Sequence, residues 1–297
     1  MTEPDHRCAP ARPDPKAATP ARVAALGPFF AFETRQESGI PGPPPAPWRA
    51  LGELLDDPSV LRARVTAVRG YLAAAGGQPV TAVEERVAAS VTQLGLASRL
   101  LSPAFAVGVL TGEALPFDPR RAWWQPVPGG PFPLSLPRRT TGRGAGGDPG
   151  EDPGASASAS ADQEPETGEP WDPVGLADRL ARDLLDGPIR ELVAAAGAYS
   201  LSPHILWGNV ASAVNGAASA IARTAPELAG RAGELATQLL DRPPLRGAGG
   251  PTADGGGFRR RSCCLIYRAA PDRAGALCGD CVLTGRPRPL PGRAGLR

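Results

Sequence analysis

Four of the five cysteines in this 297-residue sequence lie within a stretch of 19 residues. Cys263 and Cys264 are adjacent, and Cys278 and Cys281 follow after a 13-residue spacer, which makes the pattern C-C-x13-C-x2-C. Four thiolates can ligate a tetrahedral zinc ion or an iron–sulfur cluster. The spacing therefore predicts a metal or redox centre in this segment.

The two halves of the cysteine pattern carry different information. The C-x2-C half suits both kinds of centre, and Gly279 is expected to allow its tight turn. Zinc ribbons use C-x2–4-C on both sides, whereas Cys263 and Cys264 are adjacent and would point to opposite faces of a strand. A bent backbone is therefore needed for both to reach one centre. The spacing leaves three alternatives open: an iron–sulfur cluster, a structural zinc ion, and a disulfide or unliganded thiols.

The remaining residue types exclude several other kinds of site. Lys16 is the single lysine, and its Pro-rich surroundings suit neither a phosphate-binding loop nor a Schiff base. His6 and His204 are too few for a site of several imidazoles. Residues 142–147 superficially match a dinucleotide fingerprint, but no predicted strand precedes them and no predicted helix follows. The clustered cysteines are thus the main candidates for chemistry.

Charge and hydropathy bear on partners and location. The formal net charge is +2, which gives no strong field for nucleic acid or for an acidic membrane. The sequence has no run of 18 apolar residues and no apolar signal-peptide core at its start, so we expect neither stable membrane insertion nor secretion. The expected location is the cytoplasm, where clustered cysteines more often bind metal or do redox chemistry than form disulfides.

The chain that must position the cysteines is predicted to be mostly α-helical. Residues 48–111 carry apolar residues at helical spacing, with Thr81 and Glu84 placed as a capping box. One expected helical face consists of Val83, Val87, Val91, Leu94, Ser98 and Leu101. Residues 123–137 predict extended structure around a Gly-Gly turn, and their prolines favour edge strands or loop.

Helical signals return in the second half of the chain. Three helix starts are expected: the pairs Asp172-Pro173 and Ser202-Pro203, and a capping box from Thr224 to Glu227. A break is expected at Gly187-Pro188. The helix after Ser202 is rich in Gly, Ala and Ser, so another element can pack close to its backbone.

Composition divides the chain into segments. Residues 138–170 contain no Leu, Ile, Val, Met or aromatic side chain and cannot contribute to a core. The expected organisation is a disordered tail (1–22), a mostly helical region (23–137), a disordered insertion (138–170), a second helical region (171–242), a Gly/Pro-rich hinge (243–257) and the cysteine module (258–285). The predicted fold class is mostly α with a few short strands.

The cysteine module resembles a known family. The segment RRRSCCLIYR, followed by LCGDC, is similar to the C-terminal module of FhuF-type ferric-siderophore reductases. The stretch SPHILWGNVASAVNGAA at 202–218 resembles the Leu-Trp-Gly-Asn helix of that family, and the resemblance covers roughly 171–285. This chain differs in its longer cysteine spacer and in the insertion at 138–170. Longer surface loops cost little closure entropy.

The resemblance implies a function. Cys263, Cys264, Cys278 and Cys281 would ligate one [2Fe–2S] cluster, with no catalytic residue beyond it. The implied enzyme is an oxidoreductase that takes one electron from an external ferredoxin or reductase and passes it to the Fe(III) of a siderophore. Fe(II) would be released in the cytoplasm, including at the inner face of the membrane. The alternative from another class is a structural zinc module of a binding or assembly protein.

Several residues near the motifs have two possible interpretations. Arg259, Arg260, Arg261 and Arg268 lie within five residues of the paired cysteines. Such cations would favour thiolates and raise a cluster's reduction potential, or they would form an ordinary solvated basic run. Packing or capping is expected for Trp207 and Asn209, and a surface position for His204.

Overall fold

The computed structural model describes residues 20–36, 44–138, 171–252 and 257–284. Within these residues the protein is mostly helical with two small sheets, as the sequence predicted. Most of the predicted tail and nearly all of the predicted insertion at 138–170 lie outside the described residues, as does Cys8. The first helix begins at Pro20, inside the segment expected to be a tail.

The described part of the chain contains eight α-helices. They are α1 (Pro20–Ala25), α2 (Glu53–Asp56), α3 (Pro58–Ala75), α4 (Glu85–Thr111), α5 (Pro173–Leu180), α6 (Pro188–Gly197), α7 (Pro203–Thr224) and α8 (Ala229–Leu240). Short 3₁₀ turns occur at η1 (Val80–Ala82), η3 (Pro226–Leu228) and η4 (Ile266–Ala269), and η2 (Ala181–Leu185) is a π-helical turn after α5.

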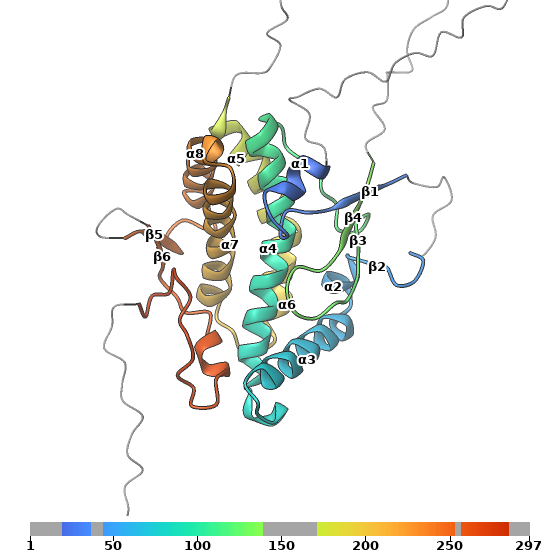
Figure 1. The fold of residues 1–297 in the computed structure, drawn as a ribbon, viewed down its shortest axis with the longest axis vertical. Helices are drawn as coiled ribbons and strands as arrows, with labels where there is room; N and C mark the ends of the chain where they lie inside the picture. Colours follow the sequence, from blue (N-terminus) through green and yellow to red (C-terminus); the bar gives the residue numbers. More distant parts are fainter. Residues whose placement is uncertain (1–19, 37–43, 139–170, 253–256, 285–297) are drawn as a thin grey trace, which may run out of the picture.

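Helices α4 and α7 pack along each other at the centre of the molecule (Figure 1). Helix α4 also contacts α3 and α6, so it is buried on more sides than a single apolar face requires. Leu96, Leu100 and Phe105 are buried, whereas Leu94 and Ser98 of the predicted face are only partly buried. The predicted face was therefore partly wrong, because neighbours surround this helix.

Both central helices are long and apolar enough to cross a membrane by length and composition alone. In the structure, 72% of the apolar window of α4 and 56% of that of α7 are buried inside the molecule. A helix that is apolar on most sides is typical of the core of a folded protein as well as of a membrane span. The mutual packing of α4 and α7 gives their apolar residues a place in the core.

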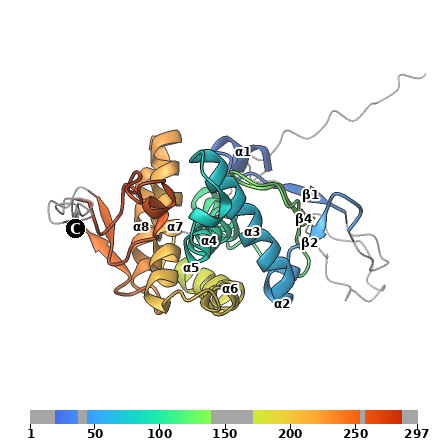
Figure 2. The same cartoon turned by 90° about the horizontal axis from the view of Figure 1, so that it is seen from below.

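A four-stranded sheet flanks the helices on the side away from α7 and α8 (Figure 2). Its strands are β1 (Glu33–Arg35), β2 (Arg49–Ala50), β3 (Trp123–Trp124) and β4 (Leu134–Pro137), in the order β1-β4-β3-β2. Strand β1 is parallel to β4, and the other neighbours are antiparallel. The prediction of edge strands was wrong, since β3 and β4 are the inner pair. Most prolines of this segment lie in the connection between them, where no ladder hydrogen bond is lost.

Helix starts show where the local sequence patterns succeed. The Asp172 carboxylate accepts a hydrogen bond from the Gly175 amide at 2.9 Å, and Ser202 caps α7. Helix α6 begins at Pro188, at the predicted break.

Neither predicted capping box forms. Thr81 lies in η1, and Glu84 is itself the N-cap residue of α4. The Thr224 hydroxyl donates to backbone carbonyls, and α8 begins only at Ala229. In both cases a 3₁₀ turn occupies the expected first turn of the helix.

Part of the expected hinge is ordered. Strand β5 (Gly249–Pro251) lies within 243–257 and pairs antiparallel with β6 (Phe258–Arg260). This short hairpin leads directly into the first two cysteines.

Candidate metal centre

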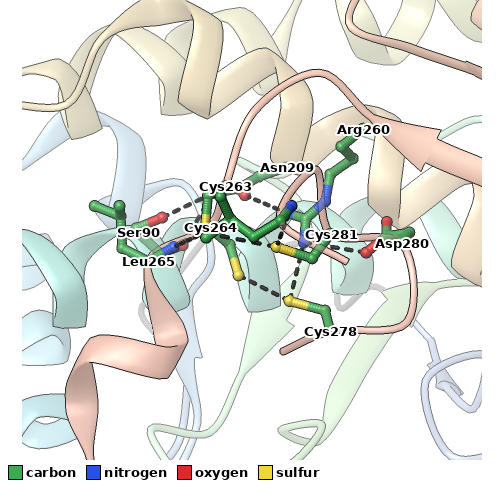
Figure 3. Close-up of polar contacts among 10 residues, drawn as sticks. Ser90, Asn209, Arg260, Cys263, Cys264, Leu265, Cys278, Asp280 and Cys281 are labelled. Atoms are coloured by element: carbon green, nitrogen blue, oxygen red, sulfur yellow. Dashed lines mark hydrogen bonds and ion pairs between the residues drawn. The ribbon is translucent and has the colours of Figure 1, made fainter. Parts of the chain in front are cut away.

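The structure brings the four clustered cysteines together, although they come from two separate turns (Figure 3). The sulfurs of Cys264 and Cys278 lie 3.0 Å apart, and those of Cys263 and Cys281 lie 3.7 Å apart. All four are free cysteines rather than disulfides. Each close pair therefore joins one cysteine of the adjacent pair to one of the C-x2-C turn.

The backbone bend expected beside the adjacent cysteines is present. Leu265 adopts the left-handed conformation with φ +69°, which a branched side chain rarely adopts. Its amide lies 3.3 Å from the sulfur of Cys263. The chain therefore turns sharply directly after Cys264 and enters η4.

The second cysteine turn is closed by its own backbone. The amide of Cys281 donates to the carbonyl of Cys278 at 3.1 Å, and the Leu283 amide lies 3.5 Å from the Cys281 sulfur. Gly279 has no positive φ, and a Cβ placed on it would meet open space. The turn therefore does not require glycine at this position.

Arg260 is the charged residue buried against the cysteines, with only 1% of its surface exposed. One guanidinium nitrogen, Nη2, lies 3.0 Å from the Cys278 sulfur and 3.1 Å from a carboxylate oxygen of Asp280. The other, Nη1, donates to the side-chain oxygen of Asn209 at 3.0 Å. The backbone amide of Arg260 also donates to the Asp280 carbonyl at 2.9 Å, so this residue joins both cysteine turns.

Asn209 connects Arg260 to the helical core. Its amide nitrogen lies 3.0 Å from the side-chain oxygen of Gln93 and 3.1 Å from the hydroxyl of Ser90, both on α4. All three side chains are buried. Asn209 lies in the middle of α7, so it caps no helix, and the capping role considered for it was wrong.

The first turn and a half of α7 holds the segment before Cys263. A Cβ on Gly208 would lie 2.0 Å from the Ser262 hydroxyl oxygen, so the absence of a side chain lets the loop sit directly on the helix. One helical turn earlier, a ring nitrogen of His204 lies 3.0 Å from the Arg261 carbonyl oxygen. His204 is exposed and contacts the loop backbone. Trp207 is partly buried, with Arg190 over its ring.

The segment after the first cysteines docks on the start of α4. Arg268 in η4 donates to the Glu84 carboxylate at 2.6 Å, and Gln78 donates to the Ala269 carbonyl. The four flanking arginines thus differ in role: Arg260 is buried, Arg268 is ion-paired, and Arg259 and Arg261 are exposed.

Charges near the cysteines stabilise one another. The pKa of the Cys264 thiol lies far below its usual range, because hydrogen bonds from the Cys263 and Cys278 thiols and the charge of Arg260 favour its thiolate. Burial would lower the pKa of Arg260, but the Cys264 thiolate and the Asp280 carboxylate raise it above its usual value. The site therefore already balances negative sulfur against a buried cation.

The donor set fits a [2Fe–2S] cluster, which needs four thiolates in two pairs. Sulfurs that share a tetrahedral ion with bonds of about 2.3 Å are separated by roughly 3.8 Å, close to the 3.7 Å of Cys263 and Cys281. The sulfurs of Cys264 and Cys278 are closer, at 3.0 Å. Two buried donors beside the cysteines, Arg260 Nε and the Ser262 hydroxyl, have no hydrogen-bond partner in the described part of the chain. In the same residues, no three His, Cys, Asp or Glu side chains are arranged around one ion position.

Exposure differs between the cysteines. Cys264 and Cys281 are 0% and 1% exposed, whereas Cys263 and Cys278 are partly exposed. A group held by all four would be shielded by protein on one side and reachable from solvent on the other.

Sequence reasoning missed two residues of this site. Ser90 and Gln93 lie among apolar residues of α4, more than a hundred residues before Asn209, and only the crossing of α4 with α7 places them next to it. The available signal in the sequence was the presence of Ser90 and Gln93, three positions apart, in a helix that is mostly apolar.

Comparison with known families agrees with this geometry. Residues 260–283 match the family model described as the FhuF 2Fe–2S C-terminal domain. The match begins at Arg260 and contains all four clustered cysteines. No curated protein and no solved structure is significantly similar to the chain. The chain thus carries an FhuF-type 2Fe–2S domain on a mostly helical body.

Proposed function

We propose that this protein, whose residues 260–283 form an FhuF-type 2Fe–2S domain, reduces the Fe(III) of ferric siderophores by one electron. Cys263, Cys264, Cys278 and Cys281 are the proposed cluster ligands. The convergence of their four sulfurs at a partly exposed site is the observation that carries the proposal. The family of the matched domain supports the substrate class.

A bound [2Fe–2S] cluster would accept and donate one electron at a time. The four thiolates hold it, and Cys264 and Cys281 keep it partly inside the protein. The exposed edges of Cys263 and Cys278 leave a short path to a partner at the surface. Each turnover takes one electron from an external ferredoxin or reductase and gives it to siderophore-bound Fe(III), which becomes Fe(II). Siderophores bind Fe(II) far more weakly, so the metal is released.

Exposed cations beside the cysteines would assist the encounter with an anionic ferric siderophore. Arg259 and Arg261 are both exposed and lie two to four residues before Cys263. Their positive charge would raise the association rate at low ionic strength, and salt would screen the effect. The proposed location is the cytoplasm, where the released Fe(II) would be used.

The zinc alternative makes a different prediction for the purified protein. An iron–sulfur protein is coloured, with charge-transfer bands in the visible spectrum, and contains two iron atoms and two sulfides per chain. A structural zinc module is colourless and contains one zinc ion. The absorption spectrum with metal analysis separates the two.

Stopped-flow mixing tests the reductase activity. Dithionite-reduced protein, freed of excess reductant, is mixed with hydroxamate, catecholate and citrate complexes of Fe(III), and reoxidation of the visible bands is followed. We expect reoxidation by at least one complex, with Fe(II) trapped by a chelating dye. The Arg259→Gln/Arg261→Gln variant should react more slowly with anionic complexes at low salt and equally at high salt. A wild-type protein that stays reduced with every complex would overturn the reductase function.

A further inference from the structure

We propose that Arg260 is a positioning residue that holds both cysteine turns around the cluster and provides its buried counter-charge, and that Asn209 fixes this guanidinium to the helical core. The inference goes beyond the proposed reductase function. It depends on the 2Fe–2S domain and is independent of which substrate the electron reaches.

The position of Arg260 argues for a role toward the cysteines. It precedes the first turn, yet its guanidinium lies 3.0 Å from the sulfur of Cys278 in the second turn and its amide bonds the carbonyl of Asp280 (Figure 3). Its side chain has no exposed surface. A guanidinium has five donors in a rigid plane, so one residue can orient both cysteine turns.

The contact with Asn209 fixes the position of the guanidinium relative to α7. Asn209 can bond Arg260 only through its oxygen, because a guanidinium donates and does not accept. The amide nitrogen of Asn209 contacts Ser90 and Gln93 on α4. These groups are buried, so each bond that is lost would leave an unsatisfied polar group in the core. The chain of contacts runs from α4 through α7 to Cys278, and it sets the distance of the second cysteine turn from the helices.

The charge of Arg260 is expected to affect the reduction potential of the cluster. A four-thiolate [2Fe–2S] centre is negative and gains one more negative charge on reduction. A buried cation within hydrogen-bond distance of a ligand sulfur favours the reduced form and raises the reduction potential. Exposed Arg259, one residue earlier, is screened by water and should have little such effect.

Three single variants of the full-length, cluster-loaded protein test the proposal. Arg260→Gln removes the buried charge, Arg260→Lys keeps it without the planar fork, and Arg259→Gln removes an exposed charge nearby. The potential is measured by a dye-coupled redox titration followed in the visible spectrum. We expect Arg260→Gln to shift the ratio of reduced to oxidised protein at a fixed potential at least tenfold toward oxidised, which equals about 59 mV for one electron. Arg259→Gln should stay within twofold of wild type, and Arg260→Lys should recover most of the shift.

Cluster loading provides the second measurement, because Arg260→Gln could fail to assemble the site. In that case loading is expected for Arg260→Lys and Arg259→Gln and absent only for Arg260→Gln. Equal shifts or equal losses in Arg260→Gln and Arg259→Gln would overturn the counter-charge role. An Arg260→Lys variant as impaired as Arg260→Gln would do the same.

Asn209→Leu separates positioning from charge. This variant keeps the charge of Arg260 and the branched shape of the side chain at position 209 but removes its hydrogen bonds. We expect its potential to shift less than that of Arg260→Gln, while the cluster is lost to a chelator several-fold faster than in wild type. A cluster as long-lived as that of wild type would refute the role of Asn209.

Discussion

Two buried arginines lie on opposite sides of the helical core, and their surroundings differ. Arg99 of α4 faces the four-stranded sheet, and Arg260 of β6 lies beside the cysteines and contacts α7. On the sheet side, Arg99 of α4 is 2% exposed and donates to the carbonyls of Phe132 at 2.9 Å, Phe29 at 2.7 Å and Ala31. On the cysteine side, Arg260 is 1% exposed and contacts the Cys278 sulfur, Asp280 and Asn209.

The two surroundings change the guanidinium in opposite directions. Burial lowers the pKa of Arg99 to about 10, because the carbonyls around it are dipoles without net charge. The thiolate and the carboxylate raise the pKa of Arg260 despite its burial. Arg99 therefore ties irregular backbone segments to α4 at a cost in desolvation, whereas Arg260 neutralises anions that the site must contain.

The largest expected effect is loss of the cluster when one of its cysteine ligands is changed. Changing any of Cys263, Cys264, Cys278 or Cys281 to Ala should abolish the visible spectrum or leave a small fraction of the cluster, because each thiolate is one of four ligands. Cys8→Ala should leave the spectrum unchanged. Iron and sulfide analysis of the purified variants measures this. A requirement for Cys8 together with a dispensable Cys in the cluster would contradict the ligand assignment.

Arg99→Gln should lower the stability of the protein without affecting the cysteine site. At least two of the three carbonyls would lose their donor, one of these bonds being buried and two partly buried, and we expect the free energy of unfolding to fall by about 3 kcal/mol. Denaturant titration measures the loss. The reduction potential of the folded variant should equal that of wild type, in contrast to Arg260→Gln. A shifted potential in Arg99→Gln would show that the two arginines are not separate in function.

Gly208→Ala tests how closely the cysteine loop must sit on α7. The added methyl group would approach the Ser262 hydroxyl, and overpacking of this kind costs about 1–2 kcal/mol. We expect faster cluster loss to a chelator. The matched double variant Gly208→Ala/Ser262→Ala removes the clashing oxygen and should recover part of the loss. No recovery would mean that the backbone approach, and not the hydroxyl, is limiting.

The smallest expected effect concerns the ion pair between Glu84 and Arg268. Burial would raise the pKa of Glu84, but the hydrogen bond and charge of Arg268 outweigh it and hold the pKa below its usual range. The ionised carboxylate thus stabilises the folded state above the unfolded pKa of about 4.3. This stabilisation is lost as the pH falls through the lower, folded pKa. Because the pair is partly exposed, Glu84→Gln should cost under about 1 kcal/mol at pH 7.

The pH dependence supplies the control for this pair. The difference in unfolding free energy between wild type and Glu84→Gln should be constant from pH 5 to 8, shrink as the pH falls below the unfolded pKa, and disappear below the lower, folded pKa. A difference that persists in acid would assign the effect to packing rather than to charge.

Local sequence patterns predicted the helix starts that depend on one or two residues. Asp172 and Ser202 cap their helices because an N-cap bond spans only three residues. The capping box expected at Thr81 failed for a tertiary reason, because the Glu84 carboxylate binds Arg268 from the cysteine module. The inner position of β3 and β4 likewise depends on β1 and β2, which are distant in the sequence.

The sequence by itself determined the chemistry of this protein: four cysteines at a specific spacing, in a chain with two histidines and one lysine. It also showed that adjacent cysteines need a bent backbone, since that follows from local geometry, and the chain turns sharply at Leu265 directly after them. Only the tertiary structure decided which of four neighbouring arginines is buried against the sulfurs. Burial of Arg260 depends on Gly208 and Asn209, and these are placed by the packing of α7 on α4, whose residues are more than a hundred positions apart in the chain.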